Sequence, residues 1–312
     1  MEEISEAVNQ TKTVEQMNYF ELLAWLGIGS SHPGGFPTTV KNLEVMEVKP
    51  EDIILDAGCG SGLTACHLAK QRGCRVIGID LNPQMIEKAR QRAIHEKVTD
   101  LVEFQIADAY QLPYPANHFD WVMCESITVF LDKEKAYREF FRVLKPEGRI
   151  ADLEMSLLHE LPDQLHSQLE LCYGKGTNPL SYDDWCKVAS EVGFADVEIR
   201  NPQTLLNTNS NLIFNELKKD FMLIKDLVQK VSNHPGLYTR LQQNANFMKH
   251  YKGYFGFGMV YGRKPTPPPQ PKKPTLPGTL ATSVQCVLGR TVLTVGSIRE
   301  KILLPLSKHL RQ

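Results

Sequence analysis

The sequence predicts an α/β fold built on a doubly wound, mostly parallel sheet. The first observation is that strand-like and helix-like segments alternate from residue 51 to about 200. The second is that several strand-like runs are apolar throughout, as expected of parallel strands covered on both faces. The third is the alternating run YFGFGMVYG at 254–262, which is expected to form a last, antiparallel strand.

The elements expected before that last strand follow from the local patterns. The expected strands are Ile53–Asp56, Arg75–Asp80, Val102–Ala107, Phe119–Glu125, Gly148–Glu154 and Asp196–Arg200. One helix begins at Asn82-Pro83, a capping residue followed by proline, and is expected to place Met85, Ile86, Ala89, Ala93 and Ile94 on one side. A second spans roughly 132–144 with Ala136, Phe140, Val143 and Leu144 inward, and a third, Tyr182–Val192, ends at Gly193.

The remaining segments suggest how the chain is divided. Residues 1–45 are expected to form a helical flap, although GIGSSHPGGFP within it is too rich in glycine and proline to be regular. The main domain is expected at 46–263, with helical cap segments near 156–180 and 203–249. A proline-rich, extended linker follows at 264–278. The basic and aliphatic tail at 279–312 is expected to be disordered or to dock weakly on a partner or a membrane surface.

Composition excludes several classes of protein. The 312 residues are 42% hydrophobic and carry a formal net charge of −1, so no global charge favours nucleic-acid binding. The seven cysteines are scattered and contain no CxxC pair, which argues against a disulfide framework or a zinc site. The acidic, polar start is not a secretory signal, and no apolar run reaches the ~20 residues of a membrane span. We therefore expect a cytoplasmic protein without a metal.

The stretch IILDAGCGSG at 53–62 is the first motif that carries chemistry. A strand, a glycine turn and a helix together offer backbone N–H groups to a ligand. A phosphate-binding P-loop needs a lysine after the last glycine, and none follows Gly62. A dinucleotide fingerprint can be placed on Gly60, Gly62 and Ala65, with Asp80 as the acid for the ribose. A third interpretation begins at Asp56 and uses Gly58, Gly60 and Gly62 ahead of Asp80.

Two downstream acids favour the third interpretation. Asp108-Ala109 follows the third expected strand, where the acid can accept from an adenine amino group and the Ala109 N–H can serve a ring nitrogen. Asp80 then faces the ribose, and the glycine turn faces an amino-acid tail rather than a pyrophosphate. S-adenosylmethionine has that shape, and its cationic sulfur suits a site lined by Asp56, Asp80, Asp108 and Glu125.

At this point the sequence resembles a known family. The runs ILDAGCGSG, VIGIDLNPQMIEKAR, FQIADAYQLPYPANHFDWV and FFRVLKPEGRI resemble class I S-adenosylmethionine-dependent methyltransferases, and most closely the small-molecule group of ubiquinone/menaquinone biosynthesis. The resemblance covers about residues 45–200. It implies a seven-stranded sheet with its last strand antiparallel. It also implies that Gly58, Gly60, Gly62 and Glu125 lie near the methionine part of the cofactor, that Asp80 binds the ribose, and that Leu81, Asp108 and Ala109 lie at the adenine.

The catalytic and acceptor residues are less constrained. Methyl transfer is a displacement at an activated carbon, so positioning supplies much of the rate, and a base is needed only where the acceptor carries a proton at working pH. His32, in GSSHPGGFP, is the candidate base. Tyr19, Phe36 and Tyr173 are candidate contacts to a small-molecule acceptor. Three cysteines, Cys66, Cys172 and Cys186, would have to converge for metalloid methylation.

Two other functions stay open from the residues alone. A nicotinamide-dependent oxidoreductase would use Gly60, Gly62 and Asp80, and a non-catalytic protein could bind S-adenosylmethionine without turnover. Nucleic-acid methylation is disfavoured because CESITVF, and no Asn/Asp-Pro-Pro-Tyr sequence, ends the fourth expected strand. The acceptor and the oligomeric state are not predicted.

Overall fold

The computed structural model describes residues 34–207 and 232–267, together with positions 17, 22, 25, 26, 32, 229 and 230. The proline-rich stretch beyond 267 and the tail at 279–312 lie outside the described residues, as do most of residues 1–33 of the flap expected at 1–45. Among the described helices, none combines the length and apolar character that crossing a membrane requires.

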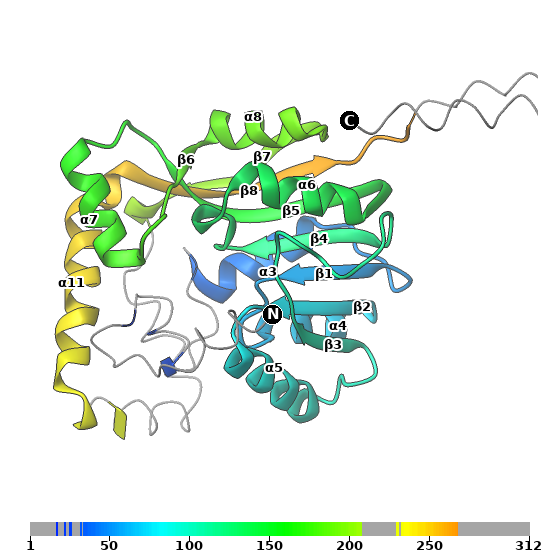
Figure 1. The fold of residues 1–312 in the computed structure, drawn as a ribbon, viewed down its shortest axis with the longest axis horizontal. Helices are drawn as coiled ribbons and strands as arrows, with labels where there is room; N and C mark the ends of the chain where they lie inside the picture. The colour runs from blue at the N-terminus through cyan, green and yellow to red at the C-terminus, as the bar shows by residue number, and fades with distance from the viewer. Residues whose placement is uncertain are drawn as a thin grey trace, which may run out of the picture. The chain divides into compact units, whose positions relative to one another are not determined.

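A single mixed sheet forms the centre of the described domain (Figure 1). Its strands are β1 (Ile53–Ala57), β2 (Arg75–Asp80), β3 (Val102–Ile106), β4 (Phe119–Glu125), β5 (Leu144–Leu157), β6 (Leu180–Ser181), β7 (Ala195–Thr204) and β8 (Phe255–Arg263). The order across the sheet is β3-β2-β1-β4-β5-β8-β7, and the two-residue β6 pairs with the end of β5. Only β8 runs against its neighbours among these strands. The predicted doubly wound sheet with an antiparallel last strand is confirmed.

The strand order creates the place for a ligand. β1 pairs with β2 on one side and with β4 on the other, both in parallel. The chain therefore reverses direction across the sheet at β1, and the loops that follow β1 and β4 diverge at its carboxyl edge. Ligands of open α/β sheets bind at such a switch point.

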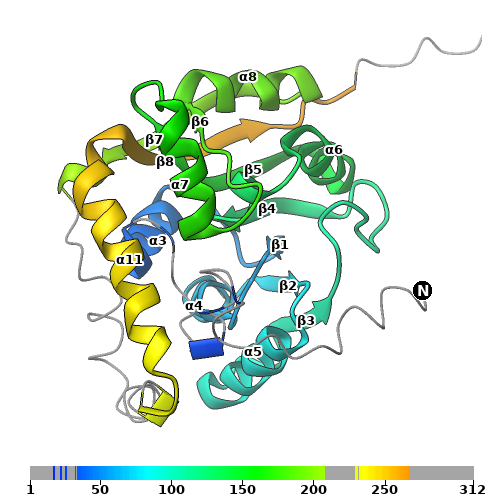
Figure 2. The ribbon, with the colours of Figure 1, turned by 60° about the vertical axis from the view of Figure 1, so that its left-hand side comes forward.

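Helices cover both faces of the sheet. They are α3 (Gly35–Val45), α4 (Leu63–Arg72), α5 (Pro83–Glu96), α6 (Lys133–Val143), α7 (Asp163–Tyr173), α8 (Tyr182–Val192) and α11 (Pro235–Tyr251), with short turns η1 (Thr128–Phe130), η2 (Leu205–Asn207) and η3 (Lys252–Tyr254). One core cluster joins the sheet to α4 and α5, and the other joins it to α6, α8, α7 and α11. α7 and α11 contact each other near the carboxyl ends of the parallel strands, where a cap was expected (Figures 1 and 2).

Most helix boundaries follow the predicted signals, with two corrections. Asn82 caps α5 through a bond from the Gln84 N–H, and Pro83 occupies the first helical position. Ile94, predicted to face inward, is 68% exposed because it lies about 100° around the helix from the buried Ala93. The stretch expected to be irregular contains the start of α3: Gly34, at φ 82, turns the chain, and the helix begins at Gly35.

The end of the domain also differs from the predicted boundary. The linker was expected from residue 264, yet the Lys264 ammonium is buried and donates to the carbonyls of Phe141 and Leu144 and to Asn117 Oδ1. Thr266 bonds to Glu147 through both its N–H and its hydroxyl. The described chain is thus held to the domain up to these residues, and the chain divides into units at 267/268.

Candidate active site

The glycine turn after β1 is closed by contacts that only glycine permits. The N–H groups of Gly58 and Cys59 both donate to the Ile79 carbonyl of β2, at 2.8 and 2.9 Å. Gly58 has φ 77, and a Cβ there would lie 2.4 Å from Ile127 Cγ2. At Gly62, with φ 74, a Cβ would lie 2.8 Å from Ala89. The turn is therefore packed closely against Ile127 and Ala89, and side chains are excluded at both glycines.

Asp80 connects this turn to the start of α5. Its Oδ2 accepts from the Gly60 N–H at 3.0 Å, and its Oδ1 accepts from the Asn82 N–H at 2.8 Å. Burial raises the pKa of the Asp80 carboxyl, and the two backbone bonds work in the opposite direction. A carboxylate has roughly four acceptor sites, so these two bonds leave capacity for a pair of ligand hydroxyls.

An apolar edge lies beside Asp80. Leu81 is 65% exposed, and Ile106 at the end of β3 is 55% exposed. Asp108 is exposed and accepts from the Tyr110 N–H through Oδ1 at 2.9 Å, and Ala109 is half-buried. Exposed aliphatic side chains beside an acid form a surface that a planar, amine-bearing ring would cover.

Glu125, at the end of β4, lies at the centre of a hydroxyl-lined network. Thr39 of α3 donates to Oε1 and Thr64 of α4 donates to Oε2, each at 2.7 Å. His32 Nε2 lies 2.9 Å from Thr39 Oγ1 and 3.7 Å from Glu125 Oε1. The structure thus brings together the predicted His32 and Glu125, which are 93 positions apart, and joins them through Thr39.

The directions of these bonds assign the ring nitrogens of His32. The single hydroxyl proton of Thr39 goes to Glu125, so Thr39 can only accept from the ring. His32 Nε2 therefore carries the hydrogen that Thr39 accepts. The imidazole is buried, which fixes its orientation toward Thr39.

Asp56, at the end of β1, carries an unsatisfied polar atom beneath the turn. Its Oδ2 is buried and has no hydrogen-bond partner among the described residues. Burial raises the pKa of its carboxyl well above the usual range, and the negative charges of Glu125 and Asp80 add to the effect. A cationic ligand would relieve both the repulsion and the missing bond, so these residues fit S-adenosylmethionine better than an anionic dinucleotide.

The candidate contacts to the methyl acceptor do not lie together in one cluster. Phe36 meets the His67 ring of α4 edge-on at 5.0 Å. Tyr173 ends α7 and meets Phe247 of α11 at 6.4 Å. These two candidates come from separate elements around the carboxyl edge, and Tyr19 lies outside the described residues.

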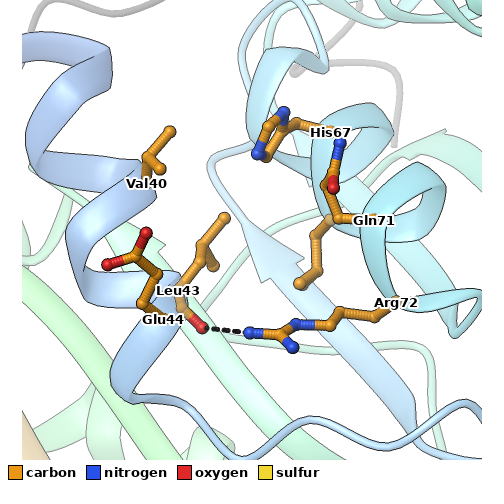
Figure 3. Close-up of a pocket in the computed structure, with 7 residues that line it drawn as sticks. Val40, Leu43, Glu44, His67, Gln71 and Arg72 are labelled. Atoms are coloured by element: carbon orange, nitrogen blue, oxygen red, sulfur yellow. Dashed lines mark hydrogen bonds between the residues drawn. The ribbon is translucent and has the colours of Figure 1, made fainter.

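A pocket lies between α3 and α4, next to Phe36, whose ring meets His67. Val40, Leu43 and Glu44 line one side of it and His67, Gln71 and Arg72 the other, with the Arg72 guanidinium donating to the Leu43 carbonyl at 3.3 Å (Figure 3). It is the seam between two helices and contains none of the predicted site residues.

The cysteines within the described residues do not form a thiol site. Cys66 belongs to one core cluster and Cys172 to the other, so they cannot converge on one ligand. Burial raises the pKa of Cys66 to about 12 and that of Cys59 well above its usual value, which keeps both thiols protonated. Among the described residues, no three His, Cys, Asp or Glu side chains are arranged to hold a metal ion.

Comparison with known proteins decides between the remaining ligand classes. Residues 55–151 match the family model described as a methyltransferase domain. The uncharacterised methyltransferase YodH of Bacillus subtilis is 29% identical over 238 residues, which is 76% of this chain and 95% of YodH. The chain carries the domain of an S-adenosylmethionine-dependent methyltransferase. The match selects methyl transfer over hydride transfer with a nicotinamide cofactor.

Other proteins match a shorter part of the chain or share its fold. Phosphoethanolamine N-methyltransferase 1 of Zea mays is 38% identical over 125 residues, covering 40% of this chain and 25% of the maize enzyme. The structure of Haemonchus contortus phosphoethanolamine N-methyltransferase 2 in complex with S-adenosyl-L-methionine has a TM-score of 0.62 and 21% identity, covering 81% of this chain and 59% of that one. The narrower resemblance to the ubiquinone/menaquinone group stays a prediction.

Sequence reasoning missed the two threonines that hold Glu125. Thr39 was overlooked because it lies just after the stretch at 27–37 that was expected to be irregular, so no regular element was expected to position it. Thr64 stands two positions after Gly62, in the first turn of α4, where a hydroxyl beside a ligand-binding turn was a signal that could have been used.

Proposed function

We propose that the methyltransferase acts on a small acceptor that loses a proton from N–H or O–H as it reacts, and that His32 receives this proton. The observation that carries the proposal is the chain of contacts from His32 through Thr39 to Glu125. A methyltransferase for an acceptor that is already deprotonated would need no such arrangement.

The residues proposed to hold the cofactor surround the carboxyl edge of β1, β2 and β4. Asp80 is proposed to accept from the ribose hydroxyls, and Leu81 with Asp108 and Ala109 to contact the adenine. The turn at 58–62 is proposed to present backbone N–H groups to the amino-acid end, near Glu125 and Asp56. When bound, S-adenosylmethionine supplies an electrophilic methyl group.

His32 is suited to a proton-accepting role by its neighbours. The His32 ring is proposed to take the proton, and the electron pair left on the acceptor nitrogen or oxygen becomes the nucleophile. The imidazolium so formed donates from Nε2 to Thr39 and lies 3.7 Å from the Glu125 carboxylate. That carboxylate stabilises the new positive charge in a buried setting, where the attraction exceeds its value in water.

The acceptor is proposed to lie between α3, α7 and α11, with Phe36 and Tyr173 at its border. These elements supply aromatic and aliphatic side chains there, in keeping with a small organic acceptor. The plant and nematode relatives are named for methylation of phosphoethanolamine, so amines belong first among acceptors to be tried.

The test has two parts. Release of S-adenosylhomocysteine is first measured over amines (phosphoethanolamine and ethanolamine among them), phenols, quinols and thiols, with the product identified by mass. With the best acceptor, His32→Gln is expected to lower kcat by roughly 100-fold or more, the usual range for losing a general base. Its Kd for S-adenosylhomocysteine should stay within about twofold, because the proposed contacts to the cofactor remain.

A matched control is His166→Gln, which changes an exposed histidine on α7 and should leave kcat and Kd unchanged. If His32→Gln keeps the wild-type kcat, the proposed role of His32 is contradicted, but the proposed cofactor site is not. Absence of S-adenosylhomocysteine binding to the wild-type protein would contradict the assignment of the cofactor site.

A further inference from the structure

A row of polar side chains lies in the middle of β5, apart from the candidate cofactor and acceptor residues. Asp152 and Glu154 have no measurable exposure, and Ser156 is 1% exposed. They alternate along the strand, so all three project from the same face of the sheet. Two fully buried carboxyl groups on a central strand are costly and need specific partners.

Each carboxyl group accepts a hydrogen bond from another element. The Tyr137 hydroxyl of α6 donates to Asp152 Oδ2 at 2.8 Å. The backbone N–H of Thr128, the first residue of η1, donates to Glu154 Oε1 at 2.7 Å. The bond to Thr128 connects the pair to the segment that follows β4, because η1 comes shortly after the end of that strand.

The remaining two oxygens complete the pair. Asp152 Oδ1 and Glu154 Oε2 are buried without a hydrogen-bond partner among the described residues, and the two carboxyl groups interact directly. One proton shared between them would satisfy both oxygens and leave a single negative charge. Burial raises the pKa of both groups, that of Asp152 to about 6.

The groups that face this pair come from three elements. Tyr137 and Lys133 belong to α6, Cys124 belongs to β4, and Thr128 belongs to η1. The Lys133 ammonium donates to the carbonyls of Val129 and Leu131, and its charge favours the one negative charge of the pair. The pair therefore contacts the segment that follows β4 and helps to hold it in place.

That segment, residues 125–130, forms one wall of the cofactor site. It begins with Glu125, which holds Thr39 and Thr64. Ser126 has a left-handed φ of 56 and donates its N–H to the Leu153 carbonyl at 2.8 Å. Ile127 then fills the space that a Cβ on Gly58 would occupy. Displacing the segment would move Ile127 off the glycine turn and rotate Glu125.

We propose that Glu154 is a positioning residue for the cofactor site, holding the 125–130 segment through the Thr128 N–H while sharing a proton with Asp152. It touches neither the cofactor nor the acceptor. The role rests on the proposed function only in that the glycine turn and Glu125 hold S-adenosylmethionine.

Glu154→Asp tests this role because it keeps the acid and shortens its reach to Thr128 by one methylene. We expect it to raise the Kd for S-adenosylhomocysteine, measured by calorimetry, about tenfold, as for the loss of one buried hydrogen bond. Hydrogen exchange at the Thr128 amide should accelerate by a similar factor. Glu154→Gln, whose carbonyl can accept from Thr128 and whose amide can donate to Asp152, should restore both values to within about twofold.

The control is Tyr137→Phe, which removes a hydrogen bond from the same cluster but none to the 125–130 segment. It should lower the melting temperature and leave both the Kd and the Thr128 exchange rate unchanged. If Glu154→Asp keeps the wild-type Kd and exchange rate, or if Tyr137→Phe changes them equally, Glu154 is only a core residue and the proposal is overturned. Failure of the wild-type protein to bind would instead refute the cofactor site. Hydrogen exchange at the Thr128 amide of the unliganded wild-type protein tests the proposal even if the variants do not fold. An unprotected amide would refute the hydrogen bond to Glu154.

Discussion

Gly58→Ala is the change that most directly tests how the glycine turn is built. The residue at 58 must adopt φ 77, and its Cβ would stand 2.4 Å from Ile127 Cγ2. Gly73→Ala is a matched control from the same chain. Gly73 has a nearly identical φ of 70 at the end of α4, but nothing lies within 4 Å of its Cβ position.

The two variants separate backbone strain from steric overlap. A non-glycine residue in the left-handed region costs about 1–2 kcal/mol, and both variants incur this cost. Only Gly58→Ala adds overpacking, typically about 1–3 kcal/mol, as Ile127 is pushed away. We therefore expect the free energy of unfolding to fall by about 2–5 kcal/mol in Gly58→Ala and by about 1–2 kcal/mol in Gly73→Ala.

Denaturant unfolding and calorimetric titration with S-adenosylhomocysteine measure the two effects. Gly73→Ala should keep the wild-type Kd, because the end of α4 is remote from the turn. Gly58→Ala should weaken binding about tenfold or more, because the new Cβ overlaps Ile127 and displaces it beside the proposed ligand site. Equal losses of stability in the two variants, with a wild-type Kd in Gly58→Ala, would refute the close contact between the turn and the 125–130 segment.

Three further predictions concern other parts of the domain. Asp80→Asn should raise the Kd for S-adenosylhomocysteine at least about tenfold by weakening the charged contact to two hydroxyls, and an unchanged Kd would mean that the ribose lies elsewhere. Lys264→Met should lower the free energy of unfolding by about 2–4 kcal/mol, because it leaves several buried carbonyls without a donor, with the Kd unaffected. The pKa of Asp152 is raised to about 6 in the folded protein from an ordinary value of 3.8, which means that the folded state holds the proton more tightly than the unfolded chain does. The contribution of Asp152 to the free energy of unfolding should therefore be largest at low pH. It should fall by about 1.4 kcal/mol per pH unit between about pH 4 and pH 6. Asp152→Asn should flatten that slope in pH-dependent denaturant titrations, and an unchanged slope would assign it to other groups.

Much of the sheet could be predicted because its strands obey local rules. The bounds of β2 and β4 coincide with the predicted runs, since a parallel strand covered on both faces must be apolar along its length. β7 proved longer than the predicted Asp196–Arg200, reaching Thr204 through Pro202. Its position at the edge of the sheet explains this, because a proline there interrupts no ladder on its outer side.

The errors arose where a residue's role depends on distant partners. The segment before α3 contains glycine and proline, which weigh against a helix. Gly34 supplies the turn, Pro37 falls in the first helical turn where proline is tolerated, and packing stabilises the rest. Glu154 and Asp152 gave no signal, because a strand pattern does not show whether an acid faces solvent or another acid.

The sequence by itself determined the sheet, the glycine turn and the two acids that follow β2 and β3. These depend on apolar runs, positive φ angles and the ends of parallel strands, all of which are encoded within a few residues. Tertiary structure alone decided that Thr39 joins His32 to Glu125 and that Glu154 supports the segment after β4. Each of those contacts joins residues of different elements, and only the packing of those elements brings them within hydrogen-bond distance.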